Sequence, residues 1–437
     1  MNGPPRVSRW MLLLVVLAAI SARAAACTVY PGNLSDDRDV YLTIASGIRE
    51  GRGLSAPGTS TPTAYRPPLY PLLLAPFSRP NQAVARAALH GALAAGMVLS
   101  VFWLAGLSGV SPRRQLVAAL LVAFDPLLVY YSTLPMTETL AAACSALLLA
   151  TGAAACRSSS ISRRTLYCAL GAVAFGLCVM TRPTYWALAM CVIAFGGWQA
   201  IRGAADAEKH PPRMLDWMLG GVLTVAVIAP WCVRNWRVMG SPILTTTHGG
   251  YTLLLGNNEA YYEEVVRQPL GTVWDGSRGP GQQAWAAGLA DQLRAAGVQG
   301  EIETDRWLKD RARKAIRAQP GAFLMACVRR FLSFWSVRPH ADSASAAGQA
   351  LSWFSAAYYS ALWIALVVGG WNAIRQGGCA VELCLLLVAA FVLVHLVYWT
   401  DARMRAPIMP AIAVLAVQSR RRPWSTLPAS NLVSGRR

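Results

Sequence analysis

Apolar runs and short polar connections alternate along most of this chain, and the pattern predicts an all-α polytopic membrane protein. The runs are about 20 residues long, which is the length that a helix needs to cross roughly 30 Å of hydrocarbon. They begin near Trp10, Ala83, Gln115, Thr137, Leu166, Thr184, Met214, Ser352, Cys379 and Arg405. We expect about ten transmembrane helices, the first of them retained although its sequence also fits a cleavable signal peptide.

Composition and charge fit a membrane protein. Of 437 residues, 55% are hydrophobic and only 14% are charged, which lies outside the usual range of soluble globular proteins. The net charge of +19 comes almost wholly from arginine. In a soluble protein such a charge would suggest nucleic acid. Here many arginines flank apolar runs, where membrane topology explains them. We therefore expect membrane lipids and no nucleic acid as partners.

Basic residues lie on alternate connections, and this asymmetry predicts the orientation. They are Arg113 and Arg114, then Arg157, Arg163 and Arg164, then Arg202, Lys209 and Arg213, then Arg375, and finally Arg420, Arg421 and Arg422. The positive-inside rule places these connections and both termini in the cytoplasm. The connections 31–82, 131–136, 181–183, 234–350 and 400–404 then face outward together. We expect a bacterial inner-membrane protein with an outward-facing active site.

The runs and connections divide the chain into four parts. These are an N-terminal transmembrane module at 1–234 that includes the first extracytoplasmic loop at 31–82, an extracytoplasmic insert at 235–350, C-terminal transmembrane helices at 351–418, and a basic cytoplasmic tail at 419–437. Most of the polar, helix-compatible sequence lies in the insert. Its run at 321–335 carries Arg329 and Arg330, each costing about 2.5–3.5 kcal/mol at a bilayer centre. We expect an interfacial helix there.

The first loop contains an amphipathic segment. Its apolar residues recur at helical spacing and are Val40, Tyr41, Ile44, Ala45 and Ile48. This predicts a helix over 37–48 that lies on the bilayer surface. Acidic residues gather where it begins, and carboxylates there cap free backbone N–H groups and oppose the helix dipole. Capping is therefore the expected role of most of these acids.

Polar residues at the outward ends of the apolar runs are the strongest chemical signal. They include Glu138, Arg182, Arg234, Asn235, Arg403 and Arg405. Singly, each is explained by the helix dipole or by snorkelling. Together, the outward arginines oppose the charge bias of topology. Guanidinium groups bind phosphate through paired donors, and a nearby carboxylate can accept the proton of an attacking hydroxyl. The set predicts group transfer from a lipid-phosphate donor.

The cysteines show no chemical motif. Five of the ten lie inside apolar runs and no C-x-x-C pair occurs. We interpret them as small buried hydrophobic residues, not as a disulfide framework or a zinc site. No cofactor is certain. A divalent metal held by paired carboxylates is possible, but no ligand spacing demands one.

Ordered motifs at successive outward ends carry a family resemblance. They are D-x-x-x-Y at Asp37 to Tyr41 followed by IASGIREGRGLS, TAYRPPLYPLLLA from Thr63, LPMTETL with Glu138, TRP from Thr181, PWCVRNW through GGYTLLLGNN at Pro230 to Asn258, and RMRAPIMP from Arg403. The chain resembles the family 39 glycosyltransferases, membrane enzymes of GT-C type that include protein O-mannosyltransferases and the aminoarabinose transferase of lipid A.

This resemblance implies inverting transfer of a sugar from a polyprenyl-phosphate donor to a glycan, lipid or protein acceptor. Asp37 matches the first-loop aspartate that acts as general base, and Glu138 matches a second acidic position. Arg38 stands where protein O-mannosyltransferases carry glutamate, which weakens the case for a protein acceptor, and its charge favours an ionised Asp37. The residues expected to bind substrate or position loops are Tyr41, Arg66, Arg182, Arg234, Asn235, Asn257, Arg403 and Arg405.

Two other functions stay open. A transporter or flippase of a lipid-linked sugar would also need an outward phosphate site, but carriers usually show paired, broken spans in two matching halves. A lipid-linked glycan ligase or polymerase would keep arginines in the large outward loop but would lack the D-x-x-x-Y and R-P-P-L-Y-P motifs of the first loop.

Overall fold

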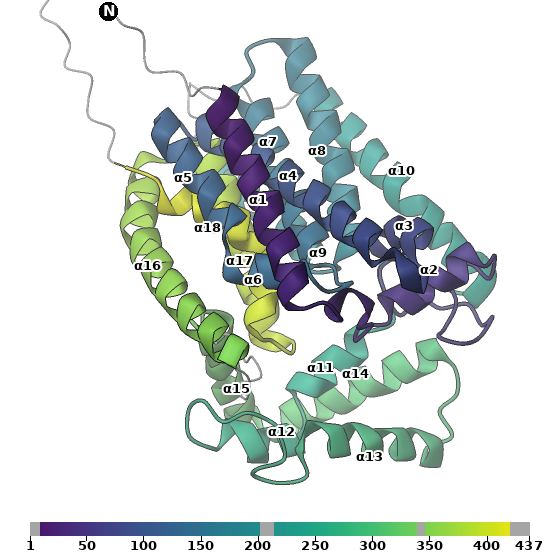
Figure 1. Cartoon of the computed structure of the whole chain (residues 1–437). Helices are drawn as coiled ribbons and strands as arrows, with labels where there is room; N and C mark the ends of the chain where they lie inside the picture. Colours follow the sequence, from purple (N-terminus) through teal and green to yellow (C-terminus); the bar gives the residue numbers. More distant parts are fainter. Residues whose placement is uncertain (1–8, 202–213, 339–345, 420–437) are drawn as a thin grey trace, which may run out of the picture.

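The chain folds as a helical bundle with a smaller helical layer beneath it (Figure 1). The computed structural model describes residues 9–201, 214–338 and 346–419. Within these residues there is no β-strand, only an isolated bridge between Ser55 and Pro62. The all-α prediction is therefore confirmed. The predicted basic tail lies outside the described residues from position 420 on, as do Arg202, Lys209 and Arg213.

Seven of the described helices are long and apolar enough to cross a membrane. They are α1 (Arg9–Val29), α4 (Ala83–Leu107), α7 (Glu138–Arg157), α8 (Ile161–Thr181), α10 (Met214–Met239), α16 (Ala346–Gln376) and α17 (Cys379–Val397). This confirms a polytopic integral membrane protein.

The other three expected spans are shorter helices. The run from Gln115 is divided into α5 (Pro112–Ala123) and α6 (Pro126–Tyr131), because Pro126 starts a new helix that the Asp125 side chain caps. The run from Thr184 forms α9 (Tyr185–Ile201), and the last forms η5 (Ala402–Ile408) and α18 (Met409–Ala416). Residues 409–415 are all buried, so α18 belongs to the core of the bundle.

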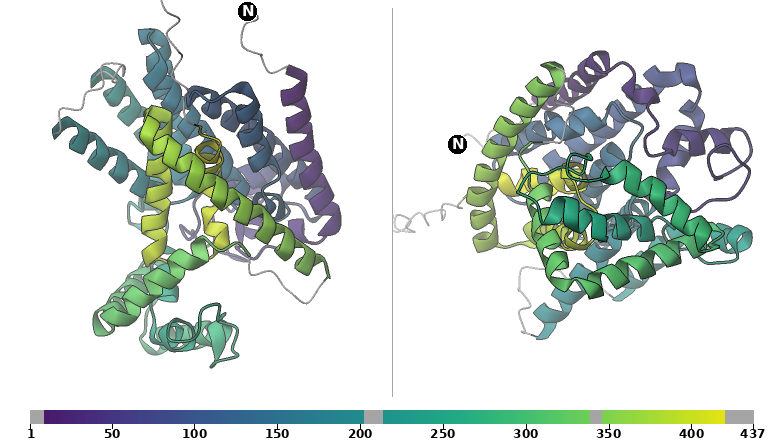
Figure 2. Two further views of the ribbon diagram at one scale, coloured as in Figure 1. Left: turned by 90° about the vertical axis from the view of Figure 1, so that its left-hand side faces the viewer. Right: turned by 90° about the horizontal axis from the view of Figure 1, so that it is seen from below.

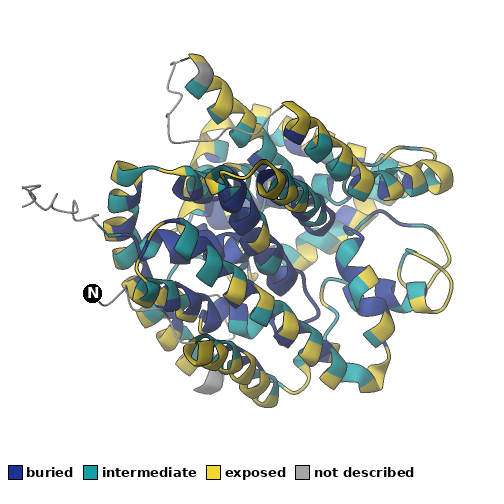
Figure 3. Ribbon diagram, turned by 90° about the horizontal axis from the view of Figure 1, so that it is seen from above, coloured by how far each residue is buried: buried dark blue, intermediate teal, exposed yellow. Residues whose placement is uncertain are grey.

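Burial separates a protein-facing core from a lipid-facing rim. In α7, 67% of the apolar window is buried, against 17% in α1, α10 and α16. Large apolar side chains on the outer helices, such as Leu14, Val225 and Ile364, are exposed. Figure 3 shows the same contrast between central and outer helices. Apolar residues therefore fill the core and also cover the outer faces of the outer helices, as expected of a bundle whose rim meets lipid.

The connections whose arginines predicted the membrane orientation lie at one end of the bundle. Arg114 donates to the Val417 carbonyl (2.8 Å), and Arg157 donates to the Leu107 carbonyl (2.6 Å). The opposite end carries the first loop, the 131–137 turn and η5, and it faces the lower helical layer (Figure 1). We call it the insert end.

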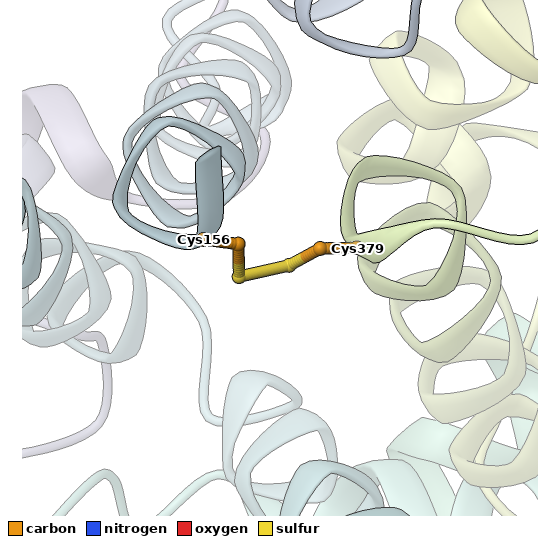
Figure 4. The surroundings of a disulfide bond; sticks show 2 residues. All are labelled: Cys156 and Cys379. Carbon is orange, nitrogen blue, oxygen red and sulfur yellow. A yellow bond between two sulfur atoms is a disulfide. The ribbon is translucent and has the colours of Figure 1, made fainter. Parts of the chain in front are cut away.

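A disulfide joins Cys156, near the end of α7, to Cys379, the first residue of α17 (Figure 4). The expectation that the cysteines form no disulfide is therefore wrong for this pair. The two residues lie 223 positions apart and meet only because the two helix ends pack together. No sequence spacing announces such a contact. The other eight cysteines are free.

The lower layer is built from residues between α10 and α16. Its helices are α11 (Gly249–Gly256), α12 (Glu259–Tyr261), the π-helix η4 (Tyr262–Val266), α13 (Gly281–Ala295), α14 (Glu301–Ala318) and α15 (Pro320–Phe334). Two small apolar clusters hold the layer together, and both include aromatic residues from 398–399. Seen from below, these helices lie across the insert end of the bundle (Figure 2).

The 15-residue helix α15 is shorter than the seven possible spans. Its two central arginines bond to protein carbonyls. Arg330 donates to the carbonyls of Leu396 (2.6 Å) and Gly256 (2.5 Å), and Arg329 donates to those of Pro269 (2.9 Å) and Gln268.

The first loop forms α2 (Tyr41–Arg49) and α3 (Leu69–Leu74). The predicted helix over 37–48 therefore begins four residues late, because Val40 takes a left-handed conformation with φ 59°. For a β-branched residue this costs about 1–3 kcal/mol. The apolar face of α2 packs on α3, with the rings of Tyr41 and Tyr70 5.3 Å apart. This left-handed turn lies between Asp39 and the first residue of α2.

Replacing Cys379 with serine should lower the midpoint of thermal unfolding in detergent, because losing a disulfide typically costs about 2–4 kcal/mol. Cys168→Ser, at a free and half-buried cysteine, is the matched control. Alkylation and mass spectrometry of the unreduced protein should count eight free thiols. A count of ten would contradict the disulfide.

Candidate active site

Asp39, just before α2, bridges two arginines at the insert end. Its carboxylate accepts from Arg66 Nη2 (3.1 Å) and from Arg403 Nη1 (3.2 Å). Arg66 Nε also donates to the Asp39 carbonyl (3.0 Å). Arg66 belongs to the R-P-P-L-Y-P motif of the first loop and Arg403 to η5, so one carboxylate joins parts of the chain that are distant in sequence.

A second ion pair lies beside the first. Arg182, immediately after α8, donates from Nη2 to Glu138 Oε1 (2.7 Å) and from Nε to Thr137 (3.2 Å). Glu138 Oε2 is buried and has no partner among the described residues. Met404 contacts Arg182 at 3.6 Å, which places this pair next to η5. We call Arg66, Arg182 and Arg403 the arginine cluster.

Electrostatics keep the Asp39 carboxylate charged. Burial alone would raise its pKa, but the positive charges of Arg403, Arg66 and Arg182 outweigh burial, so the pKa is lowered. Burial would lower the pKa of Arg66, and the neighbouring Tyr41 and Asp39 reverse that effect and raise it. Arg403 also pairs with Asp401 at 3.3 Å. At neutral pH Asp39, Arg66 and Arg403 are therefore ionised, and the carboxylate offsets part of the positive charge.

Asp37 lies two residues away and has different neighbours. Its carboxylate accepts from the backbone N–H groups of Leu42 (2.8 Å) and Thr43 (2.7 Å) and from the Thr43 hydroxyl (2.6 Å), so it caps α2. Asp37 also lines a cavity of about 390 Å³. The other lining residues are Ser35, Leu42, Thr43, Ser46, Arg49, Glu50, Ser78, Pro80 and Arg86. Four of the lining residues carry hydroxyl groups, namely Ser35, Thr43, Ser46 and Ser78.

Arg38 does not pair with Asp37. Its guanidinium binds the exposed Asp36 at 2.6 Å. The expectation that Arg38 keeps Asp37 ionised is therefore not supported by a direct contact, because the turn before α2 directs Arg38 toward Asp36.

Arg234 and Asn235, near the end of α10, hold loops in place. Arg234 donates to the carbonyls of Thr63 (2.8 Å) and Leu54, and Asn235 donates to the carbonyl of Ile243 (2.9 Å). Neither residue contacts Asp39. Arg234 fixes the segment that leads into Arg66, and Asn235 fixes the chain that follows α10, so both hold loops in position.

Arg405 and Asn257 also lie apart from the arginine cluster. Arg405 is fully buried, donates to the carbonyls of Phe334 (3.0 Å) and Ser336 (2.6 Å), and stacks over Tyr359 at 4.0 Å. Asn257 donates to the Val397 carbonyl (2.8 Å). Tyr41 is different, because the Arg66 guanidinium lies 5.2 Å from its ring centre.

Sequence reasoning missed two residues of the insert that reach the first loop. Glu301, at the start of α14, accepts from the Thr63 hydroxyl (2.5 Å), the Ala64 N–H (2.8 Å) and the Thr247 hydroxyl. His248, just before α11, lies against Tyr65 with ring centres 4.4 Å apart. Only the position of His248 directly before GGYTLLLGNN, within the motif region from Pro230 to Asn258, gave a signal, and Glu301 gave none.

No group of three or more His, Cys, Asp or Glu side chains lies at metal-binding distance in the part of the chain that the structure describes. The candidate site consists of the charged residues and the cavity given above.

Replacing Glu301 with alanine should loosen the segment that carries Arg66, because each hydrogen bond to a charged group is worth about 1.5–3 kcal/mol. Hydrogen exchange of the amides at 54–66 and 245–250 should accelerate by about tenfold or more. Glu303→Ala is the matched control, since Glu303 lies in the same first turn of α14 and is exposed. Equal exchange in both variants would show that Glu301 does not hold the loop.

Comparisons with known proteins place this geometry in a known architecture. No protein-family model and no curated protein sequence matches the chain. Among solved structures, the oligosaccharyltransferase AglB of Archaeoglobus fulgidus matches in its apo form with a TM-score of 0.54 and 15% identity. Its complex with an inhibitory peptide and a dolichol-phosphate matches with a TM-score of 0.51 and 12% identity. Each match covers 93% of this chain and 49% of AglB.

The chain thus spans about half the length of AglB. ArnT of Cupriavidus metallidurans bound to undecaprenyl phosphate matches at a TM-score of 0.41 and 13% identity, over 93% of this chain and 76% of ArnT. At these identities the matches to AglB report architecture only. The chain has the GT-C fold of membrane glycosyltransferases.

Proposed function

We propose that this protein is an inverting glycosyltransferase that moves a sugar from a polyprenyl-phosphate donor to an acceptor hydroxyl at the extracytoplasmic membrane face. The observation that carries the proposal is the arginine cluster, in which Arg66, Arg182 and Arg403 converge with Asp39 and Glu138 at one end of a membrane bundle. The presence of dolichol-phosphate in the AglB complex, a protein of the same fold, supports a lipid-phosphate donor.

The charge change of the reaction suits this cluster. The acceptor oxygen attacks the anomeric carbon, a C–O bond forms on one face, and the bond to the phosphate oxygen breaks on the other. The leaving group takes the electron pair, so its phosphate changes from a singly to a doubly charged ester. Guanidinium groups stabilise this growing charge more in the transition state than in the bound donor, which is the condition for catalysis.

The two first-loop aspartates have separate roles in this proposal. Asp39 orients Arg66 and Arg403 toward the donor phosphate. Asp37 is the general base that takes the proton of the acceptor hydroxyl. Its Oδ1 accepts one hydrogen bond, from Leu42, which leaves a lone pair for that hydroxyl. The 390 Å³ cavity that Asp37 lines has the hydroxyl-rich character suited to a sugar acceptor.

The four other residues that sequence reasoning assigned to substrate binding, Arg234, Asn235, Asn257 and Arg405, act in this proposal by holding the walls of the site. Their hydrogen bonds to backbone carbonyls support this assignment. Tyr41 acts as a platform under Arg66.

Arg403→Ala should weaken binding of undecaprenyl phosphate by roughly 10- to 100-fold, because a charge-assisted hydrogen bond is lost. Arg403→Lys, which retains the charge but not the planar fork, should lie between the variant and the wild type. Native mass spectrometry of the full chain in detergent measures the affinity. Arg313→Ala removes an exposed arginine of α14 and should leave binding unchanged. Equal affinity in all four proteins would remove the phosphate site.

Asp37→Asn should lower sugar transfer by about 10²–10⁴-fold and leave the affinity for undecaprenyl phosphate unchanged, as expected when a general base is lost. The measurement is consumption of radiolabelled undecaprenyl-phosphate sugar by membranes that contain each variant and supply the acceptor. Asp36→Asn, at the exposed partner of Arg38, is the control. Movement of intact donor across the membrane without consumption would instead indicate a flippase.

A further inference from the structure

His248 occupies a place next to the arginine cluster that no part of the proposed mechanism uses. It is the residue before α11, and its ring lies between Tyr65, at 4.4 Å and 67°, and Tyr251, at 5.3 Å and 26°. All three side chains are partly exposed. The Arg66 guanidinium in turn lies 5.3 Å from the Tyr65 ring centre. Through Tyr65, the aromatic group of Tyr65, His248 and Tyr251 therefore adjoins Arg66, which the proposed function assigns to the donor phosphate.

The ring of His248 has an unused hydrogen-bonding atom. Its Nδ1 is buried and has no partner among the residues that the structure describes. His90, a histidine buried in the bundle, contrasts with it: Nε2 lies 2.8 Å from the Tyr70 hydroxyl and Nδ1 lies 2.6 Å from the Ser132 carbonyl. An unpaired buried polar atom costs free energy, so a ligand that satisfies it gains affinity and specificity.

The charges around His248 decide which chemical group it suits. Burial, together with the positive charges of Arg66 and Arg403, lowers its pKa to about 3, and the nearby Asp39 only partly opposes this. The ring is therefore neutral at physiological pH. A neutral imidazole has one donor and one acceptor nitrogen, which matches a hydroxyl group. The arginines already supply the positive charge that a phosphate needs.

The covalent structure of the donor places its sugar next to this aromatic group. In a polyprenyl-phosphate sugar, the sugar is bonded directly to the phosphate. A phosphate held by Arg66 and Arg403 therefore brings the sugar into contact with whatever lies in the next layer, which includes the Tyr65 and His248 rings. Tyrosine rings supply flat apolar faces for the C–H groups of a sugar, and His248 supplies the polar contact.

We propose that Tyr65, His248 and Tyr251 form the binding subsite for the donor sugar, and that His248 Nδ1 forms a hydrogen bond with one of its hydroxyl groups. This subsite rests on the proposed function, because it requires that the arginine cluster holds the donor phosphate. It assigns recognition of the sugar to two residues of the insert and to Tyr65 of the first loop, and recognition of the phosphate to the arginine cluster.

Two substitutions separate the hydrogen bond from the ring. His248→Phe keeps the aromatic contacts with Tyr65 and Tyr251 and removes both nitrogens. His248→Asn loses the ring but places an amide group near the position of Nδ1. The probes are undecaprenyl phosphate alone and undecaprenyl phosphate linked to mannose, glucose, galactose or arabinose. Binding to the full chain in nanodiscs is measured by titration, between pH 6 and 8.

The wild type should bind at least one of the sugar-linked lipids more tightly than the sugar-free lipid. In His248→Phe this gain should fall by about 3- to 10-fold, the effect of one hydrogen bond between uncharged groups. His248→Asn should recover most of the gain, and the affinity for undecaprenyl phosphate alone should be the same in all three proteins. The gain should not change with pH across this range.

Three results of the sugar-dependent measurement would overturn the subsite, and a fourth comes from the sugar-free lipid. One is the absence of any sugar-dependent gain in the wild type, another is a full gain in His248→Phe, and the third is an equal loss in His248→Phe and His248→Asn. A weakened affinity for the sugar-free lipid in His248→Phe would assign His248 to the phosphate and also overturn the proposal. Failure of the wild type to bind undecaprenyl phosphate at all would reject the proposed function itself.

Discussion

The bridge from Asp39 to Arg66 and Arg403 is the interaction on which the insert end depends. It joins the first loop to η5 across 364 positions of sequence. Removing charges from water is costly, and a buried ionic group contributes only when every partner is present. The loss of one arginine would leave a carboxylate partly unpaired in a site that is mostly shielded from water. The positions of the first loop, the start of α7, the end of α8 and η5 are therefore coupled through charge compensation.

Other arginines of the chain lie outside the arginine cluster and bond to backbone carbonyls. Arg86, Arg330 and Arg405 are among the largest fully buried side chains. Each donates to backbone carbonyls where a helix ends or the chain turns, such as those of Leu34, Leu396 and Phe334. Within a membrane an unsatisfied carbonyl has no water to bond, so a guanidinium with five donors is an effective partner. An arginine at the end of a helix can thus bond to backbone carbonyls as well as to a carboxylate or a ligand.

This dual use explains why the sequence predicted Arg66, Arg182 and Arg403 but could not separate them from arginines such as Arg234 and Arg405, which bond to backbone carbonyls. The apolar runs and the ordered motifs were sufficient to predict an all-α membrane bundle of GT-C type and the side of the bundle on which charged residues gather. Arg403 and Arg405, however, share one motif and separate in space, because η5 is a 3₁₀ helix and residues two apart on it point in different directions. Asp37 and Asp39 also differ in their partners: Asp37 accepts from backbone N–H groups of α2, whereas Asp39 pairs with Arg66 and Arg403.

The motifs could not predict contacts between segments that are distant in sequence. Glu301 joins the insert to Thr63 and Ala64 over more than 230 positions, and Cys156 bonds to Cys379 over 223. Neither residue stands in a pattern that requires its partner. The division of the run at Gln115 had a visible cause in Pro126, but hydropathy averaged over a window does not register a break that keeps the sequence apolar.

Under the proposed function, the charge balance of the arginine cluster would allow a site that binds phosphate also to release it. Three arginines, Arg66, Arg182 and Arg403, are paired with Asp39, Glu138 and Asp401, so the group is neutral without a ligand. A donor phosphate must therefore exchange with a carboxylate for guanidinium hydrogen bonds, and its affinity is the difference between two charge-assisted interactions. If the proposed transfer takes place, the same exchange would work in reverse afterwards, because Asp39 and Asp401 would compete with the doubly charged product for the same donors. The paired acids would then limit the affinity for product, while the arginines would stabilise the charge that develops during the reaction.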